Sequence, residues 1–122
     1  MDKNIAVNAL AALAQPTRLE AFRALVRSEP DGMAAGALAA LLEVPQNTLS
    51  AHLSILAQAQ LVASDRQGRS VVYRARFDQV RDLTLYLLMD CCAGRREVCT
   101  PIVAGLKSCC APARGRLSKG LR

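Results

Sequence analysis

The feature that most constrains the fold is a change of hydrophobic period halfway along the chain. Between residues 46 and 59, leucines recur at spacings of i, i+4 and i+7, namely at Leu49, Leu53 and Leu56. This spacing predicts an amphipathic helix with one narrow apolar stripe. From residue 62 onward the apolar residues no longer follow the helical period, so a different kind of element must begin there.

That second element is predicted to be a β-hairpin. Residues 62–66 and 70–74 are short runs that favour strands. Gly68 lies between them and supplies the positive φ that a tight hairpin turn needs. Arg66 and Arg69 flank the tip of the hairpin, where a wing could reach the phosphate backbone of a nucleic acid. A helix followed directly by a basic hairpin predicts a winged helix-turn-helix, a mainly α fold with a β-hairpin wing.

Three helices are predicted upstream of this pair. The first spans residues 5–13. The second begins after Pro16, with Thr17 as its N-cap, and the third spans residues 34–42. Turn-forming residues 29–32 separate the second from the third. The side chains expected to face inward are Leu19, Phe22, Leu25 and Val26 of the second helix and Leu38, Leu41 and Leu42 of the third.

A last long helix is predicted from Gln79 to about Cys92, capped by Asp78, and it is apolar nearly all the way round. In a chain of only 122 residues, such a helix must bury one side in its own core and the other against a partner subunit. We therefore expect a homodimer with two-fold symmetry. The residues expected at its interface are Leu10, Leu83, Tyr86 and Leu87.

The charge and the outer face of the helix at residues 46–59 both favour nucleic acid as a partner. The net charge is +6, which favours a polyanion. The helix face opposite the leucines is polar but uncharged, with Asn47, Ser54 and Gln58 on it. Short amide and hydroxyl side chains suit base edges in a major groove, because Asn and Gln pair bidentately with adenine.

We expect a cytoplasmic protein without a membrane partner. The longest apolar stretches fall well short of the roughly 20 residues that span a bilayer, and the N-terminus lacks the features of a signal peptide. A reducing compartment would keep the five cysteines free as ligands. Residues 1–92 are predicted to form the DNA-binding and dimerisation domain, and residues 93–122 a flexible cysteine-containing segment ending in a mobile basic tail at 113–122.

Three segments in the right order resemble the ArsR/SmtB family of metal-responsive repressors. Residues 12–19 (ALAQPTRL) resemble its opening signature, residues 46–56 (QNTLSAHLSIL) its recognition helix, and residues 66–69 (RQGR), with Tyr73 following, its wing. The resemblance implies a homodimer that blocks a promoter when empty and releases double-stranded operator DNA when ligand binds. Matching its DNA-reading positions residue by residue gives Gln46, Asn47, Thr48, Ser50, Ala51 and Ser54, with Arg66 and Arg69 in the wing. Pro45 and Ala51 depart from the family pattern, which leaves the operator sequence open.

The cysteines do not match the best-known arsenic site of the family. That site uses cysteines on the first helix of the helix-turn-helix, and residues 33–42 contain none. Zinc sensors of the family use Asp, His and Glu on the last helix, whereas His52 is the single histidine and lies on another helix. We expect His52 to have a structural or phosphate-contacting role. All five thiols lie beyond residue 90, at Cys91, Cys92, Cys99, Cys109 and Cys110.

The candidate effector site is therefore the end of the last helix. A helix end between Gly94 and Pro101 would let a loop fold Cys99 back toward Cys91 and Cys92. Three thiolates in a pyramid suit the soft ions As(III) and Sb(III). Some arsenic-responsive family members resemble this chain in having a Cys-Cys pair and one later cysteine there, which ranks arsenic above cadmium and lead.

Several alternatives stay open. Cys109 and Cys110 are candidates for an additional or alternative site, or have no role, and a methylated arsenical would need only two sulfurs. The main alternative is a repressor of the same fold that responds to Cd(II), Pb(II) or thiol oxidation. Another is that the cysteines are inert and only pack in the protein. A thiol enzyme is not expected, because nothing arranges a base beside a nucleophile. A structural chromosome-binding protein would explain the charge but not the thiols.

Overall fold

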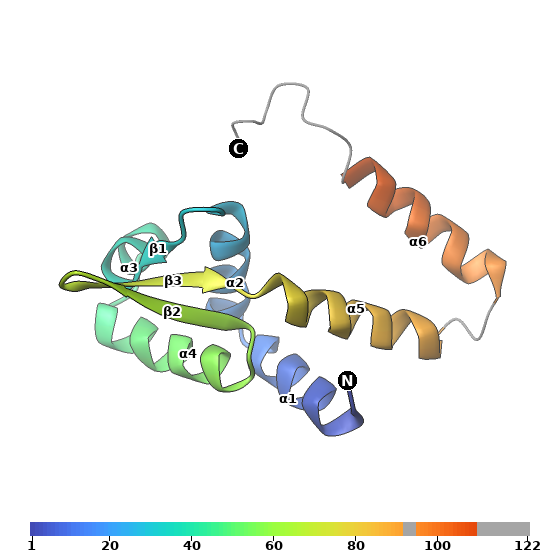
Figure 1. Ribbon diagram of the computed structural model, residues 1–122, viewed down its shortest axis with the longest axis horizontal. Coiled ribbons are helices and arrows are strands. Elements are labelled where there is room, and N and C mark those ends of the chain that lie inside the picture. The colour runs from blue at the N-terminus through green and yellow to red at the C-terminus, as the bar shows by residue number, and fades with distance from the viewer. Residues whose placement is uncertain (92–94, 110–122) are drawn as a thin grey trace.

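Six helices and three short strands make up the part of the chain that the computed structural model describes (Figure 1). It describes residues 1–91 and 95–109, except for the side chains of residues 90, 91, 99 and 107–109. The elements in chain order are α1 (Lys3–Leu13), α2 (Pro16–Arg27), β1 (Met33–Ala34), α3 (Ala35–Leu42), α4 (Gln46–Gln58), β2 (Val62–Gln67), β3 (Ser70–Ala75), α5 (Phe77–Cys91) and α6 (Arg96–Cys109). The order from α3 to β3 confirms the predicted winged helix-turn-helix.

The strands form one antiparallel sheet in the order β1-β3-β2. The predicted hairpin is confirmed, with Gln67 paired to Ser70 and a loop of two residues between them. Gly68 begins that loop at φ +64°, as expected for a tight hairpin turn. The short strand β1 was not predicted, because two residues are too few to show a period.

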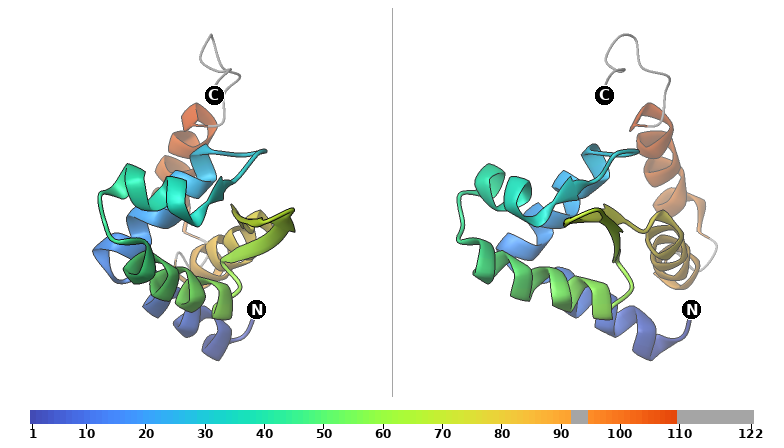
Figure 2. Two further views of the ribbon diagram at one scale, coloured as in Figure 1. Left: turned by 90° about the vertical axis from the view of Figure 1, so that its left-hand side faces the viewer. Right: turned by 60° about the vertical axis from the view of Figure 1, so that its left-hand side comes forward.

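The core lies between α1–α4 and the sheet, and leucines fill its centre. The stripe predicted for α4 is confirmed, because Leu49, Leu53 and Leu56 have no exposed surface. Leu25, Leu38 and Leu61 are equally buried. Helix α1 contributes mainly small side chains, and it lies alongside the C-terminal half of α4 (Figure 2). The buried residues of α1 are Ala6, Ala9 and Ala12.

The predicted inward faces of α2 and α3 are partly wrong. Leu19 and Leu41 were expected inside, yet both are exposed, Leu41 by 58%. Alanines occupy the inner positions instead, at Ala21 and Ala24 of α2 and at Ala39 of α3. Methyl side chains let the helices approach closely, so larger neighbours on the same helix are left on the outside.

Two predicted helix starts are also corrected. Gln15, not Thr17, caps α2, because its side-chain oxygen accepts the Arg18 amide at 2.8 Å while Pro16 takes the first helical position. Helix α5 begins before Asp78, which lies in the first turn instead of capping it. There the Arg76 guanidinium donates to the Asp78 carboxylate at 2.8 Å and lowers the pKa of Asp78.

A left-handed residue closes α3 and sets the turn into α4. Glu43 has φ +58°, and the amide of Val44 donates to the Ala39 carbonyl oxygen at 3.1 Å. This six-residue closure satisfies a carbonyl that the helix end would otherwise leave without a partner. The turn between α3 and α4 is therefore short, as a helix-turn-helix requires.

Helix α6 replaces part of a predicted loop. The sequence suggested a loop between Gly94 and Pro101, but Arg96–Cys109 is helical and contains Pro101. In Figure 1, α6 lies beyond the end of α5 and apart from the helices and sheet of the core. The boundary at residue 92 stays a prediction, and the predicted mobile tail at 113–122 lies outside the described residues. Among the described residues, no helix has both the length and the apolar character that crossing a bilayer demands.

Two glycines with positive φ give a matched test of how the sheet is held. At Gly32 (φ +75°) a Cβ atom would lie 2.6 Å from the Tyr73 carbonyl oxygen, whereas at Gly68 (φ +64°) it would meet nothing within 4 Å. Gly68→Ala should lower the free energy of unfolding by about 1 kcal/mol, from backbone strain alone. Gly32→Ala should cost at least about 1 kcal/mol more, because the β3 backbone must move. Urea unfolding measures both, and equal losses would refute the close approach of Gly32 to β3.

Candidate nucleic-acid interface

The outward face of α4 is the first part of the candidate interface. Because the leucine stripe of α4 is buried, its polar side faces solvent. All six residues predicted to read DNA are exposed, namely Gln46, Asn47, Thr48, Ser50, Ala51 and Ser54. The Asn47 side-chain oxygen accepts the Thr48 amide at 2.9 Å, which leaves the Asn47 amide nitrogen available as a donor.

A groove joins this face to the hairpin. It has a volume of about 460 Å³ and lies between the start of α3, the start of α4 and the hairpin, whose tip is at the same end of the molecule (Figure 1). Gln46 and Ser50 of α4 line it together with Arg69 of the hairpin loop. The structure therefore brings together three of the predicted residues from two separate elements. The other predicted residues, including Arg66, do not line this groove.

Apart from Tyr73, which belongs to the segment that resembles the family's wing, the remaining lining residues carried no functional signal in the sequence. Ser70, Val71 and Tyr73 of β3 form the wall beneath the hairpin tip. Gly36 of α3 lies opposite Gln46, and a Cβ atom there would be 3.4 Å from the Gln46 side-chain oxygen. Apart from Tyr73, these positions are identified only by the three-dimensional approach of α3, α4 and the hairpin.

Two arginines of the hairpin carry a charge that no described carboxylate neutralises. Arg66 and Arg69 are exposed and pair with no carboxylate in the described ranges 1–91 and 95–109. In contrast, Arg74 donates to Glu29 at 2.9 Å, and this hydrogen bond raises the pKa of Arg74. The hairpin therefore offers positive charge at its tip, while Arg74 near its base is neutralised by the loop that follows α2.

The predicted arsenic site lies mostly outside the described residues. The backbone of Cys91 ends α5, and those of Cys99 and Cys109 belong to α6, but their side chains are not described. Cys92 and Cys110 lie wholly outside the described ranges. Among the side chains that are described, no three His, Cys, Asp or Glu residues gather as metal ligands do. The cysteine site stays a prediction.

The predicted dimer residues differ in exposure. Leu10 of α1 is 42% exposed, and Tyr86 and Leu87 of α5 are half-buried. Leu83 is only 7% exposed and belongs to the core of the protomer, so its surface is not free for a partner. Other exposed apolar side chains on the same two helices were not predicted to be at the interface, namely Ile5, Val7, Phe77, Leu85 and Met89. Helices α1 and α5 thus leave an uncovered apolar surface.

Known proteins share this sequence pattern and fold. A helix-turn-helix domain family matches residues 13–65. Nodulation protein NolR of Rhizobium meliloti is 39% identical over 79 residues, which cover 65% of this chain and 62% of that protein, so the match spans less than two thirds of its length. The crystal structure of NolR from Sinorhizobium fredii is 33% identical over 71% of this chain and 85% of that one, with a TM-score of 0.57.

Further solved structures extend the likeness. An ArsR-like transcriptional regulator from Rhodococcus sp. RHA1 has a TM-score of 0.65 at 25% identity, over 88% of this chain and 93% of that one. A Mycobacterium bovis structure, described as the homodimeric winged helix-turn-helix DNA-binding domain of a possible ArsR-family regulator, has a TM-score of 0.59 at 27% identity, over 70% and 77%. One described as a possible transcriptional regulator for arsenical resistance has a TM-score of 0.58 at 28% identity, over 66% and 80%.

These three neighbours are described as transcriptional regulators or possible ones, and each shares the fold seen here. The likeness to NolR reaches one third identity over most of the length of that solved chain. The chain therefore belongs to the ArsR family of winged helix-turn-helix transcriptional regulators.

Proposed function

We propose that this protein is a homodimeric repressor that binds double-stranded operator DNA through α4 and the β2–β3 hairpin. The observation that carries the proposal is the groove in which Gln46 and Ser50 of α4 meet Arg69 of the hairpin. A helix face that reads bases beside a cation that neutralises phosphate is the arrangement that winged helix-turn-helix proteins use on DNA. A cytoplasmic location would follow from this role.

The chemistry of α4 suits the major groove. Its exposed side chains are short amides and hydroxyls, which can donate to and accept from base edges without a charge to desolvate. Arg66 and Arg69 supply the electrostatic part of binding, which does not depend on base sequence. The net charge of +6 adds a longer-range attraction to the duplex.

Dimerisation through α1 and α5 is the second part of the proposal. The exposed apolar side chains of these helices, Leu10 and Met89 among them, would be covered by the same surface of a second copy. The Mycobacterium bovis relative, described as homodimeric, supports this assembly. A two-fold axis would present two α4 faces to half-sites about one DNA turn apart.

The proposed effector is As(III), or Sb(III), held by the thiolates of Cys91, Cys92 and Cys99. Support comes from the gathering of all five cysteines beyond residue 90 and from the affinity of soft thiolates for soft ions. The relative described as a possible regulator for arsenical resistance points the same way. Because Cys91 ends α5, an ion bound there would act on a helix of the proposed dimer interface and release the operator.

Removing one wing cation tests the DNA-binding part. Arg69→Met should weaken binding to a duplex selected from a random pool and to unrelated duplexes by similar factors, because a phosphate contact is lost. The slope of log Kd against log salt concentration should fall by about one. Fluorescence anisotropy at several KCl concentrations measures both quantities.

The matched control is Arg81→Met, which removes an equal charge from α5, where Arg81 pairs with Asp82 at 3.0 Å. It should leave the salt slope unchanged. An Arg69→Met protein with the slope of the native protein would argue against a wing–phosphate contact.

Effector specificity is tested by adding arsenite, cadmium and peroxide separately to the reduced protein bound to its selected duplex. Arsenite should release the DNA. Release should be less efficient in acid, because the cysteine thiols must lose their protons to bind the ion. Serine substitution of Cys91, Cys92 or Cys99 should abolish release and leave DNA binding intact.

Serine at Cys109 or Cys110 is the matched control and should leave the response unchanged. Release by cadmium or peroxide but not by arsenite would replace arsenic with one of the rival signals. A full arsenite response in the Cys91, Cys92 and Cys99 variants would move the site to the later pair.

A further inference from the structure

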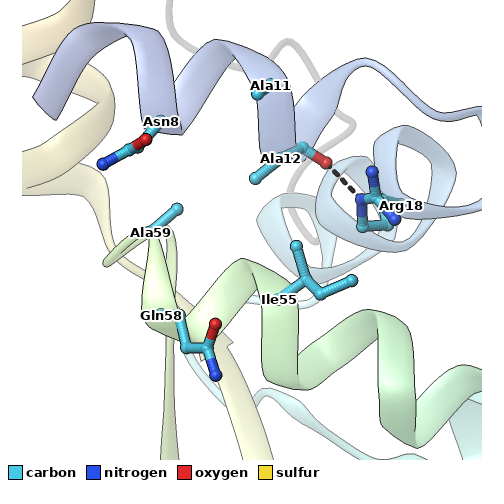
Figure 3. Close-up of a pocket in the computed structure, with 7 residues that line it drawn as sticks. All are labelled: Asn8, Ala11, Ala12, Arg18, Ile55, Gln58 and Ala59. Carbon is cyan, nitrogen blue, oxygen red and sulfur yellow. Dashed lines mark hydrogen bonds between the residues drawn. The ribbon is translucent and has the colours of Figure 1, made fainter. Parts of the chain in front are cut away.

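Arg18 links three helices through one side chain. It lies near the start of α2, and its Nε donates to the Ala12 carbonyl oxygen in the last turns of α1 at 2.6 Å (Figure 3). One of its terminal nitrogens lies 3.3 Å from Nδ1 of His52 in α4. An arginine side chain only donates hydrogen bonds, so Nδ1 of His52 accepts here and carries no proton.

The start of α2 holds Arg18 in this position. The Gln15 side chain accepts the Arg18 amide at 2.8 Å, and Pro16 fixes the backbone of the first turn. The guanidinium is therefore attached to a rigid helix start and reaches outward to two other helices. A planar donor fork suits this bridging geometry better than the single ammonium of lysine.

The α1–α4 junction is open to solvent beside Arg18. A groove of about 480 Å³ runs between the two helices, with Ala11, Ala12 and Ala59 among its lining and Arg18 on its wall (Figure 3). The polar lining side chains, Asn8 and Gln58, make no hydrogen bond across it in the structure as described. Within the described residues, Arg18 is the one side chain that hydrogen-bonds α1 and α2 to α4.

We infer that Arg18 is a positioning residue: acting through His52, it fixes the orientation of α4 relative to α1. The inference rests on the proposed function, in which α1 joins the two subunits and α4 reads DNA. The spacing of the two α4 faces then depends on how firmly α4 is attached to α1. Loss of the bridge would let the α4 faces shift and would weaken binding to correctly spaced half-sites, although Arg18 itself does not touch DNA.

The test compares Arg18→Met with Arg23→Met, which removes an equal charge from an exposed position on the same helix. Each protein is titrated with its selected duplex and with duplexes whose half-sites lie one base pair closer or farther apart. Arg18→Met should bind the preferred spacing about tenfold more weakly and discriminate less between spacings, with the salt slope unchanged. Arg23→Met should match the native protein.

A fall of about one in the salt slope of Arg18→Met would overturn the inference, because Arg18 would then be a phosphate contact. Equal behaviour of the two variants would overturn it as well. If the native protein selects no duplex, the proposed function and this inference fail together. Native binding without an Arg18 effect defeats the inference alone.

Variants at His52 test whether Arg18 acts through His52. His52→Leu removes the acceptor and should reproduce the loss of spacing discrimination, whereas His52→Asn keeps an acceptor at that position and should retain most of it. In the double variant Arg18→Met/His52→Leu the losses should not add, because both changes break one bridge. Additive losses would show that Arg18 does not act through His52. Thermal unfolding is measured for each of these variants and for Arg18→Lys. It separates an altered orientation of α4 from a failure to fold.

Discussion

Burial of the leucine stripe of α4 is the constraint on which the rest of this molecule depends. Leu49, Leu53 and Leu56 are fully enclosed, and each contributes about 1.5–3 kcal/mol relative to exposure. A rotation of α4 about its own axis would bring these side chains into water, so their burial decides which face of the helix points outward. The opposite face, with Asn47 and Ser54, is therefore held toward solvent without any contact of its own. The surface proposed to read DNA is therefore the outer side of a helix whose inner side is packed in the core.

The backbone then brings a second element to that surface. The left-handed closure at Glu43 keeps the turn between α3 and α4 short, and the close approach of Gly32 to β3 lets β1 pair with the hairpin. Gly68 turns the hairpin so that Arg69 borders the groove beside Gln46. Stability and proposed function are therefore linked, because the same backbone conformations that complete the sheet also position the wing cation. Helices α1 and α5 use their exposed faces differently, and their apolar surface suits a second subunit.

The sequence predicted the parts of the fold in which large side chains carry the period. The α4 stripe and the hairpin around Gly68 follow from this, and so does the exposure of the residues predicted to read DNA. It misjudged Leu19 and Leu41 because buried alanines, such as Ala21, show little contrast with an apolar surface. It could not find the Arg18–His52 contact, which joins residues 34 positions apart. For the cysteines, the sequence locates a segment rich in thiols, but ligand geometry depends on how side chains converge.

The most direct test of the account is an NMR titration of the isotope-labelled protein with the duplex it selects from a random pool. If α4 and the hairpin bind DNA, the largest amide shift changes will fall at residues 46–54 and 66–70, with buried positions such as Leu25 changing little. The stoichiometry should be two protein chains per duplex. Shift changes concentrated on α6 or on the exposed surface of α2, with residues 46–54 unaffected, would contradict the central claim.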